Sequence, residues 1–489
     1  MSNYIMNPSH LFCYGESHFV FIVGNLRVYE CDSETYDFLK ELTDTYKEGD
    51  VLPLEDELAD TLLESGLVSQ IKAAETESEV SSDAAKEDNT DRANDNSEEV
   101  RDDKPFVRIT NIVLELSNDC NLNCIYCYGD GGSYGRKREL MSAKTARKAV
   151  DMLFNNCGDL KEPHVTFFGG EPLLNFGVLK ETVAYCRELE ANSDKHFTFS
   201  MTTNGTICND EIEEFCLKNR VHVMLSIDGP KCVQDKQRPS CDGKSSFDKI
   251  VPNIERFKRI NRGHLTARST VCNPNYDFVG IKSSLLALGF TEVQMSLVDT
   301  DKSSPLYAGS KSKDTYNEPL VKEYERLALD YIETVKKEGK SSNKLFDSII
   351  RDLYFKNIRF TACGAGMRGF AIGTDEKIYP CHRYMGMDDY AVGTLDTGID
   401  FEATLLYRHS NVMEKEGCKE CWAKFLCGGG CSHISVTQEN DVRKAPQLYC
   451  ETYRKLYEIA IFAYSELKKW DDNVFRKMLE KAEDLPVVK

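Results

Sequence analysis

The middle of the chain, residues 105–300, alternates short apolar runs with longer amphipathic stretches. The short runs predict six β-strands, and the amphipathic stretches predict the helices that connect them. A repeated strand–helix order is typical of a parallel sheet with right-handed crossovers. Six such units would make an open, partial (β/α)6 barrel, so we predict an α/β fold class. The expected strands lie near residues 109–116, 164–168, 196–203, 221–227, 265–271 and 293–298, and the helices near 142–154, 178–190, 210–218, 247–259 and 278–288.

Residues 1–71 predict a small module ahead of this core. Two apolar runs flank Gly24-Asn25, a pair typical of a hairpin turn. Asp32 or Ser33 suits the N-cap of a helix that continues to about Thr45. A hairpin followed by helices predicts a winged-helix-like module. The further elements expected are a helix over residues 55–65, which ends at Gly66, and a short strand over 67–69.

Four further segments complete the predicted organisation. Residues 72–104 hold twelve acidic and five basic residues and no aromatic residue. Such a composition buries too little apolar surface to fold, which predicts a disordered linker, with a solvated charged helix as the alternative. The others are a helical bridge over 301–362, a Cys-rich domain over 363–450, and a C-terminal helix and tail over 451–489.

Composition and charge exclude several classes of function. The 489 residues carry a formal net charge of −19, which disfavours broad binding to nucleic acid or to an anionic membrane. The mean hydropathy is −0.44, and the longest apolar runs are too short to span a bilayer. The first residues lack the basic and apolar regions of a secretory signal, so we expect a cytoplasmic protein.

Nineteen cysteines are many for a chain without a secretory signal, which favours metal or cluster ligands over disulfides. Nine of them are scattered, and we interpret those as small buried apolar residues. The sharpest pattern is Cys120-x3-Cys124-x2-Cys127, just after the first predicted strand of the core. Three thiolates from one loop suit a [4Fe–4S] cluster whose fourth iron is open to a substrate. A zinc site is the alternative, although this spacing is unusual for zinc.

This motif, with Tyr126 at its aromatic position, resembles that of radical S-adenosylmethionine (SAM) enzymes. Supporting motifs follow in the family's order at strand ends: Gly169-Gly170-Glu171-Pro172, Thr203-Asn204-Gly205 and Ser226-Ile-Asp228-Gly-Pro. A further stretch, Asp235-Lys-Gln-Arg238-Pro239, differs from the family by having Gln234 in place of a histidine. The resemblance implies that SAM contacts Tyr126, Gly169, Gly170, Glu171, Asn204, Ser226 and Arg268.

The C-terminal cysteines resemble the SPASM extension of radical SAM enzymes that modify peptides. The spacing Cys418-x2-Cys421-x5-Cys427-x3-Cys431, followed by Cys450, matches that extension fully. The upstream block departs from it, because Glu376 stands where the family has a glycine before its second cysteine, so we expect a different turn there. A zinc ribbon is the alternative. The resemblance implies an auxiliary cluster II on Cys418, Cys421, Cys427 and Cys450, and an auxiliary cluster I on Cys363, Cys381 and Cys431.

Seven auxiliary cysteines fall one short of the eight that two [4Fe–4S] clusters need, so auxiliary cluster I would have an open iron. Some relatives place an extra cysteine shortly after the first one, but this chain has Gly364-Ala-Gly-Met-Arg-Gly369. An open iron would bind a substrate thiolate, as is thought for thioether-forming members of the family. A ligand other than cysteine, or an ordered water, is the alternative.

Residues 1–71 resemble a RiPP recognition element, the domain that binds the leader of a precursor peptide. Residues 1–70 carry three basic and fourteen acidic residues, which disfavours DNA and suits a leader that contains Lys or Arg, added as an extra strand. A structural cap is the alternative.

The whole pattern predicts a maturase that uses three [4Fe–4S] clusters, SAM and an external electron donor such as a flavodoxin or ferredoxin. Its reaction would join a precursor Cys to a carbon through a 5′-deoxyadenosyl radical, as in sactipeptides and ranthipeptides. The alternatives are a carbon–carbon or ether crosslink, epimerisation, sulfatase-type maturation and a non-catalytic iron–sulfur scaffold. No side chain stands out as a general base.

Overall fold

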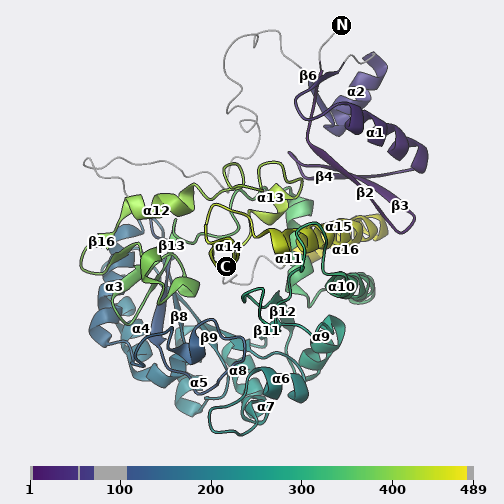
Figure 1. The fold of residues 1–489 in the computed structure, drawn as a ribbon. Coiled ribbons are helices and arrows are strands. Elements are labelled where there is room, and N and C mark those ends of the chain that lie inside the picture. The colour runs from purple at the N-terminus through teal and green to yellow at the C-terminus, as the bar shows by residue number, and fades with distance from the viewer. Residues whose placement is uncertain (1–3, 53–55, 71–106, 482–489) are drawn as a thin grey trace. The chain divides into compact units, whose positions relative to one another are not determined.

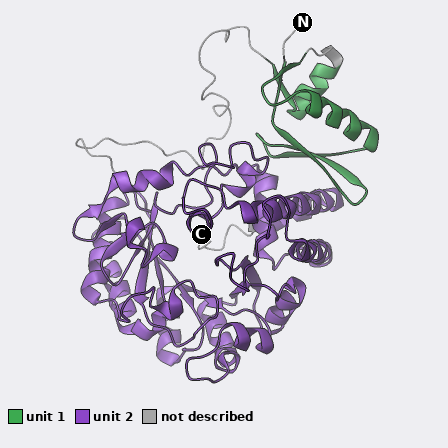
Figure 2. Cartoon of the chain, in the orientation of Figure 1, with its two compact units in different colours: residues 1–106 green, residues 107–489 purple. Residues whose placement is uncertain are grey.

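The chain divides into two compact units, residues 1–106 and 107–489 (Figure 2). The structure is a computed structural model that describes residues 4–52, 56–70 and 107–481. The predicted linker over 72–104 lies outside the described residues. None of the helices in the described ranges is long and apolar enough to cross a membrane.

The N-terminal unit contains two small antiparallel sheets and two helices. The predicted hairpin is confirmed, because Ser17–Ile22 pairs with Arg27–Cys31, and Asp32 caps the first helix by accepting a hydrogen bond of 2.8 Å from Thr35 N–H. The sheets run in the orders β2-β3-β4 and β5-β1-β6. The elements are β1 (Tyr4–Met6), β2 (Ser9–Tyr14), β3 (Ser17–Ile22), β4 (Arg27–Cys31), α1 (Ser33–Thr45), β5 (Val51–Leu52), α2 (Asp56–Ser65) and β6 (Val68–Gln70).

The second unit is built on a ten-stranded sheet whose order is β12-β11-β10-β9-β8-β7-β13-β14-β15-β16. Six neighbouring strands are parallel and follow the chain order, as the sequence predicts, with helices on the outside of the curved sheet (Figure 1). These strands are β7 (Asn111–Ser117), β8 (His164–Gly169), β9 (Thr198–Thr203), β10 (Val221–Ser226), β11 (Thr266–Val271) and β12 (Glu292–Leu297).

The connecting helices agree with the prediction apart from one interruption and one additional helix, α6 (Lys231–Gln237), that we did not predict. Pro252 lies within the predicted helix over 247–259, and a turn of 3-10 helix there, η3 (Val251–Asn253), divides it into two parts. Proline interrupts an α-helix because it has no N–H to donate. The helices are α3 (Ala143–Asn156), α4 (Phe176–Glu190), α5 (Asp210–Asn219), α6 (Lys231–Gln237), α7 (Ser246–Ile250), α8 (Ile254–Ile260) and α9 (Phe278–Ala287), with the 3-10 turns η1 (Asp130–Gly132) and η2 (Pro172–Asn175).

The Cys-rich segment adds four strands to the same sheet. Strand β13 (Gly369–Ile372) is parallel to β7 and pairs Phe370 with Ile112, so it continues the sheet beyond the first strand of the core. Strands β14 (Lys377–Tyr379), β15 (Gly393–Thr394) and β16 (Gly398–Ile399) follow as an antiparallel meander. The segment also holds η4 (His382–Tyr384), η5 (Asp388–Tyr390), α12 (Phe401–Arg408), α13 (Lys424–Cys427) and α14 (Ser432–Glu439).

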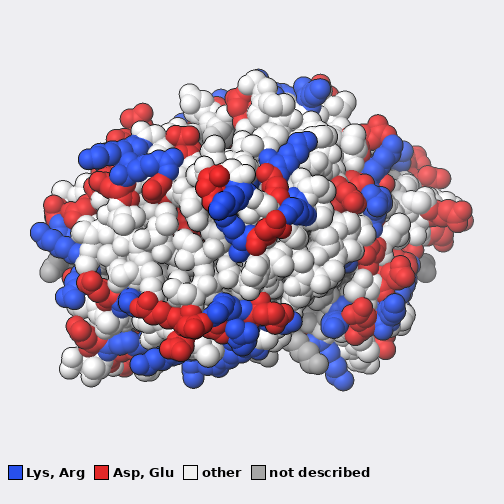
Figure 3. Space-filling model, turned by 90° about the horizontal axis from the view of Figure 1, so that it is seen from below, with Lys and Arg blue, Asp and Glu red and all other residues white. Residues whose placement is uncertain are grey.

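Long helices complete the second unit. Helix α15 (Gln447–Trp470) packs against α10 (Glu318–Glu338) and α11 (Lys344–Phe355), and α16 (Asp472–Lys481) follows it. Acidic and basic side chains are interspersed over the face that Figure 3 shows. The ion pairs between neighbouring helices include Arg256–Glu213 and Lys282–Asp330.

Candidate active site

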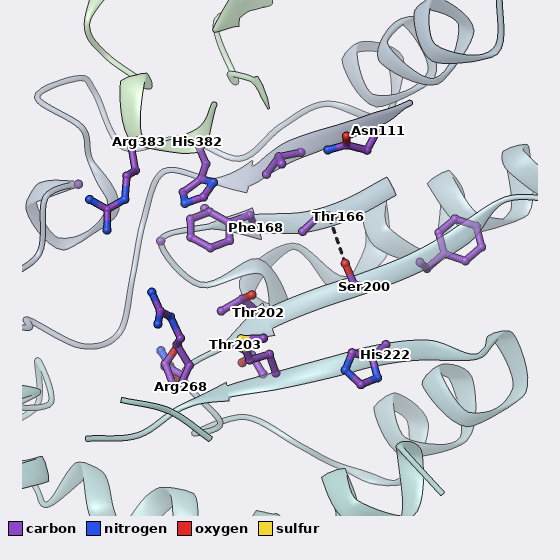
Figure 4. A pocket seen from close by; sticks show the side chains of 18 of the residues that line it. Asn111, Thr166, Phe168, Ser200, Thr202, Thr203, His222, Arg268, His382 and Arg383 are labelled. Atoms are coloured by element: carbon purple, nitrogen blue, oxygen red, sulfur yellow. Dashed lines mark hydrogen bonds between the residues drawn. The ribbon is translucent and has the colours of Figure 1, made fainter. Parts of the chain in front are cut away.

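A cavity of about 1260 Å³ occupies the inside of the curved sheet. On β8, Val165 and Phe167 are fully buried against the helices, whereas His164, Thr166 and Phe168 line the cavity. This alternation follows from the two-residue period of a strand. Figure 4 shows Phe168 beside His382 near one end of the cavity and His222 farther along it.

The three cysteines of the first motif lie in the loop after β7 and line this cavity. The Cys120 sulfur accepts hydrogen bonds from Leu122 N–H at 3.5 Å and Asn204 Nδ2 at 3.7 Å. Burial raises the pKa of Cys120 to about 12 and that of Cys124 to about 11. Buried thiols of this kind are neutral on their own and become thiolates when a metal binds.

Tyr126 connects the cysteine loop to the end of β10. Its hydroxyl donates a hydrogen bond of 2.7 Å to Asp228 and accepts one of 2.8 Å from Arg238. Asp228 is fully buried, and its carboxylate also accepts from Gln237 Nε2 at 2.8 Å. Gln234, which replaces the family's histidine, accepts from Asp228 N–H at 2.9 Å. The position of Arg238 beside Cys124 places a cation next to the thiols.

The glycine pair at the end of β8 packs against the cysteine loop. Gly170 donates to Ser117 O at 2.7 Å, and Glu171 N–H donates to Asp119 O at 2.9 Å. A Cβ atom on Gly170 would lie 2.2 Å from Asp119 O, and one on Gly169, where φ is +129°, would lie 2.3 Å from Ser117 O. Glycine is therefore required at both positions for contact between backbones.

The carboxylate of Glu171 is fully buried and accepts three hydrogen bonds from the protein. The donors are Leu173 N–H at 3.1 Å, the Thr203 hydroxyl at 2.7 Å and Asn204 N–H at 2.8 Å. Burial raises its pKa, and these donors oppose that effect. Glu171 thus fixes the turn after β9, and its contact with SAM stays a prediction.

Arg268 and Ser226 also line the cavity, on neighbouring strands. Burial, reinforced by Arg383, lowers the pKa of Arg268 to about 10, so its side chain remains a cation at neutral pH. It donates a hydrogen bond to the Ser296 hydroxyl, and among the described residues no carboxylate forms an ion pair with it. A partly buried cation without an ion-pair partner among the described residues suits a ligand that carries a carboxylate.

A group that we did not predict faces the cysteine loop from the Cys-rich segment. Arg383 forms an ion pair with Asp299, lies 5.4 Å above the Tyr128 ring, and directly follows His382. The His433 ring is 2.6 Å from Asp299. Although burial raises the pKa of Asp299, His433 and Arg383 hold it below its usual value. The residues of this group, which include Asp299, Arg383 and His433, are far apart in the sequence. Only their position beside predicted cluster ligands could have identified them.

The remaining predicted ligands form two neighbouring groups. Burial and the thiols of Cys431 and Cys363 raise the pKa of Cys381 to about 12. Burial and the thiols of Cys427, Cys418 and Cys421 likewise raise the pKa of Cys450 to about 12. The assignment of these cysteines to two auxiliary clusters stays a prediction.

Lys415 is buried beside both groups and was not predicted. Its ammonium donates to Gly429 O at 2.9 Å and to the Ser435 hydroxyl at 2.7 Å. Burial lowers its pKa, and the neighbouring cysteines, when ionised, raise it. The ammonium would offset the negative charge of thiolate ligands on both sides. The described residues form no group of three or more His, Cys, Asp or Glu placed to hold a single metal ion.

Glu376 lies in the turn where we expected a departure. Its φ is +62°, in the left-handed region that favours glycine. Glu376 therefore has a backbone conformation typical of glycine, although the family's glycine is replaced. Its carboxylate accepts a hydrogen bond from Lys148 at 2.8 Å and one from Thr145 at 3.1 Å. These contacts to α3 compensate for the strained backbone.

Residues 114–276 match the family model described as the radical SAM superfamily. The chain is a radical SAM enzyme. The matched residues include the cysteine loop and the glycine pair, and enzymes of this superfamily use a [4Fe–4S] cluster and SAM.

Two curated proteins are similar in sequence to this radical SAM enzyme. An uncharacterized protein of Methanocaldococcus jannaschii is 31% identical over 196 residues, which are 40% of this chain and 65% of that protein. A cysteine-type anaerobic sulfatase-maturating enzyme of Clostridium novyi is 25% identical over 377 residues, covering 71% of this chain and 94% of that enzyme.

A solved structure described as native anSMEcpe with bound AdoMet has a similar fold. The TM-score is 0.62 at 19% identity, over 73% of this chain and 99% of that one. The likeness supports the fold of the second unit.

Proposed function

We propose that this enzyme is a maturase that forms thioether crosslinks between a Cys and a carbon of a ribosomally made precursor peptide. One observation carries the proposal: the Cys120–Cys127 loop and the segment that follows Cys381 line the same cavity. When bound, the site cluster and SAM supply a carbon-centred radical that removes a hydrogen atom from the peptide. The cavity would hold the peptide between that chemistry and the auxiliary cysteines.

The chain's own residues would bind and orient the reactants. Cys120, Cys124 and Cys127 would hold the site cluster, while Arg238 lies beside the thiols. Arg268, a partly buried cation that forms no ion pair among the described residues, would bind the carboxylate of SAM. The buried cavity walls would exclude water from reactive groups.

Cys363, Cys381 and Cys431 would supply three ligands to auxiliary cluster I. This set is one ligand short of the four that a [4Fe–4S] cluster needs, and the nearby His433 already forms a hydrogen bond with Asp299. A precursor thiolate would complete the set, which would lower the pKa of the thiol and fix its sulfur near the reacting carbon. Spectra of the auxiliary clusters should change when the precursor is added, and a Cys→Ser precursor should cause no such change. A protein ligand on that iron in both the free and the bound enzyme would contradict this.

The N-terminal unit would bind the leader of the precursor as a winged-helix-like recognition element. Its β2-β3-β4 sheet has two edge strands, and its acidic composition suits a basic leader. The second unit would comprise the partial barrel and the SPASM domain with its three clusters. A solved structure with AdoMet and the Cp18Cys peptide, at a TM-score of 0.61, shares the fold of this unit.

The first test is loss of the site cluster. Changing Cys120, Cys124 and Cys127 together to Ala should remove about four irons per chain and abolish the formation of 5′-deoxyadenosine. Full SAM cleavage by this variant would refute the assignment of the cysteine loop.

The product identifies the reaction. A thioether removes two hydrogen atoms and one free thiol per crosslink, whereas a carbon–carbon or ether crosslink leaves the thiol count unchanged. The sulfatase-maturating relatives favour a second candidate, maturation of a sulfatase. Mass spectrometry together with thiol alkylation separates a thioether from a carbon–carbon or ether crosslink, and epimerisation would leave the mass unchanged.

A further inference from the structure

Lys415 is a buried cation among the C-terminal cysteines. It is 1% exposed, and its ammonium donates to Gly429 O at 2.9 Å and to the Ser435 hydroxyl at 2.7 Å. Both acceptors are neutral, and in the part of the chain that the structure describes no Asp or Glu forms an ion pair with Lys415. A cation in such surroundings costs free energy unless an anion compensates for it.

The two acceptors connect the ammonium to both sets of predicted cluster ligands. Gly429 lies in the chain between Cys427, a predicted ligand of auxiliary cluster II, and Cys431, a predicted ligand of auxiliary cluster I. Ser435 follows on α14, and its N–H donates to Cys431 O at 3.1 Å. The hydrogen bonds of Lys415 therefore hold its charge against the segment that joins the two sets.

The thiols of both sets also act on Lys415. Cys418 N–H donates to Lys415 O at 3.0 Å, so this residue begins the turn that leads into the second set. Burial lowers the pKa of Lys415, and the thiols of both sets, when ionised, oppose that effect; they are Cys418, Cys427 and Cys450 in one set and Cys431 in the other. The anions that compensate for this cation are thus the predicted ligands themselves, which become thiolates when a metal binds.

We propose that Lys415 is a counter-cation shared by auxiliary clusters I and II and that it raises the reduction potential of both. This rests on the proposed function, because both sets of cysteines must hold clusters. Thiolate ligands make such a cluster anionic, and its net charge is one of the factors that set its potential. Reduction adds one negative charge, so a fixed cation nearby stabilises the reduced form more than the oxidised form.

The test is a redox titration of the auxiliary clusters, followed by electron paramagnetic resonance. The parent protein is the triple Ala variant of Cys120, Cys124 and Cys127, in which only auxiliary clusters can take an electron from dithionite. Each reduction transfers one electron and forms no bond. Lys415→Met should lower the equilibrium constant of reduction about tenfold for both clusters, or about 59 mV for one electron. Lys415→Gln, which keeps an N–H donor without the charge, should have the same effect, and Lys415→Arg should retain the parent potentials.

Lys419→Met is the matched control, because Lys419 directly follows Cys418 but is exposed, so water screens its charge. It should leave both potentials unchanged. In urea unfolding of the metal-free protein, Lys415→Met should not lower the midpoint, because an apolar side chain replaces a buried cation. A lower midpoint with unchanged potentials would assign Lys415 a structural role and overturn the proposal, as would a shift in only one cluster. If the parent protein retains fewer than about eight irons per chain, the proposed auxiliary clusters fail instead, whatever Lys415 does.

Discussion

Replacing Gly170 by Ala should damage the cysteine loop without touching a cysteine. The new methyl group would lie 2.2 Å from Asp119 O and 3.0 Å from Gly132 Cα, both backbone atoms that cannot turn aside. Relief requires the end of β8 to move away from the loop, which would break the bonds from Gly170 N–H to Ser117 O and from Glu171 N–H to Asp119 O.

The cost follows from these contacts. Forcing a methyl group into a filled site costs about 1–3 kcal/mol, and each lost backbone hydrogen bond adds about 1 kcal/mol. We therefore expect the free energy of unfolding to fall by about 3–5 kcal/mol. Because Asp119 precedes Cys120, the variant should also retain less iron after reconstitution.

The assay is urea unfolding of the metal-free protein, followed by tryptophan fluorescence. Both tryptophans, Trp422 and Trp470, lie in the second unit, so the signal reports that unit alone. Gly177→Ala is the matched control, because a Cβ there meets no atom within 4 Å in α4. It should stabilise the protein by up to about 1 kcal/mol. Equal stability and iron content for Gly170→Ala and the wild type would refute the reasoning.

Three further changes test other contacts. Tyr126→Phe removes the hydroxyl between Asp228 and Arg238 and should destabilise the second unit by about 1–3 kcal/mol in the same assay; an unchanged urea midpoint would contradict this. Burial lowers the pKa of His164 to about 4. The neutral ring therefore contributes to the free energy of unfolding above pH 6.5, and about 3 kcal/mol of that contribution is lost as the pH falls toward 4. His164→Gln should lessen that loss in urea unfolding at pH 7 and 4.5, and an equal loss would oppose the assignment. Binding of a basic leader to the full chain should weaken as salt rises, as fluorescence anisotropy would measure; affinity independent of salt would exclude charge as its basis.

The strands of the core could be predicted because their buried side chains are strongly apolar. Val165 and Phe167 on β8 are fully buried, and apolar runs of this kind mark strands that are covered by helices. Short strands such as β13 and β15 carry too few residues for a pattern, and only their neighbours make them strands.

The polar wall of the cavity could not be predicted for a different reason. Thr166 and Ser200 alternate with apolar residues, which by sequence alone indicates a surface facing water. The curvature of the sheet turns that surface inward. The contact of Asp299 with Arg383 joins residues far apart in the chain, and no local pattern reports such a pair.

The pairing of β13 with β7 makes the Cys-rich segment part of the core rather than an appendage. Residues 369–372 satisfy the backbone groups along one side of β7, the strand that leads into the Cys120 loop. A chain cut before residue 363 would leave that side as a bare strand edge, a template for pairing with other molecules. Such a fragment should aggregate, and attempts to obtain the cysteine loop on a smaller protein need a substitute for β13.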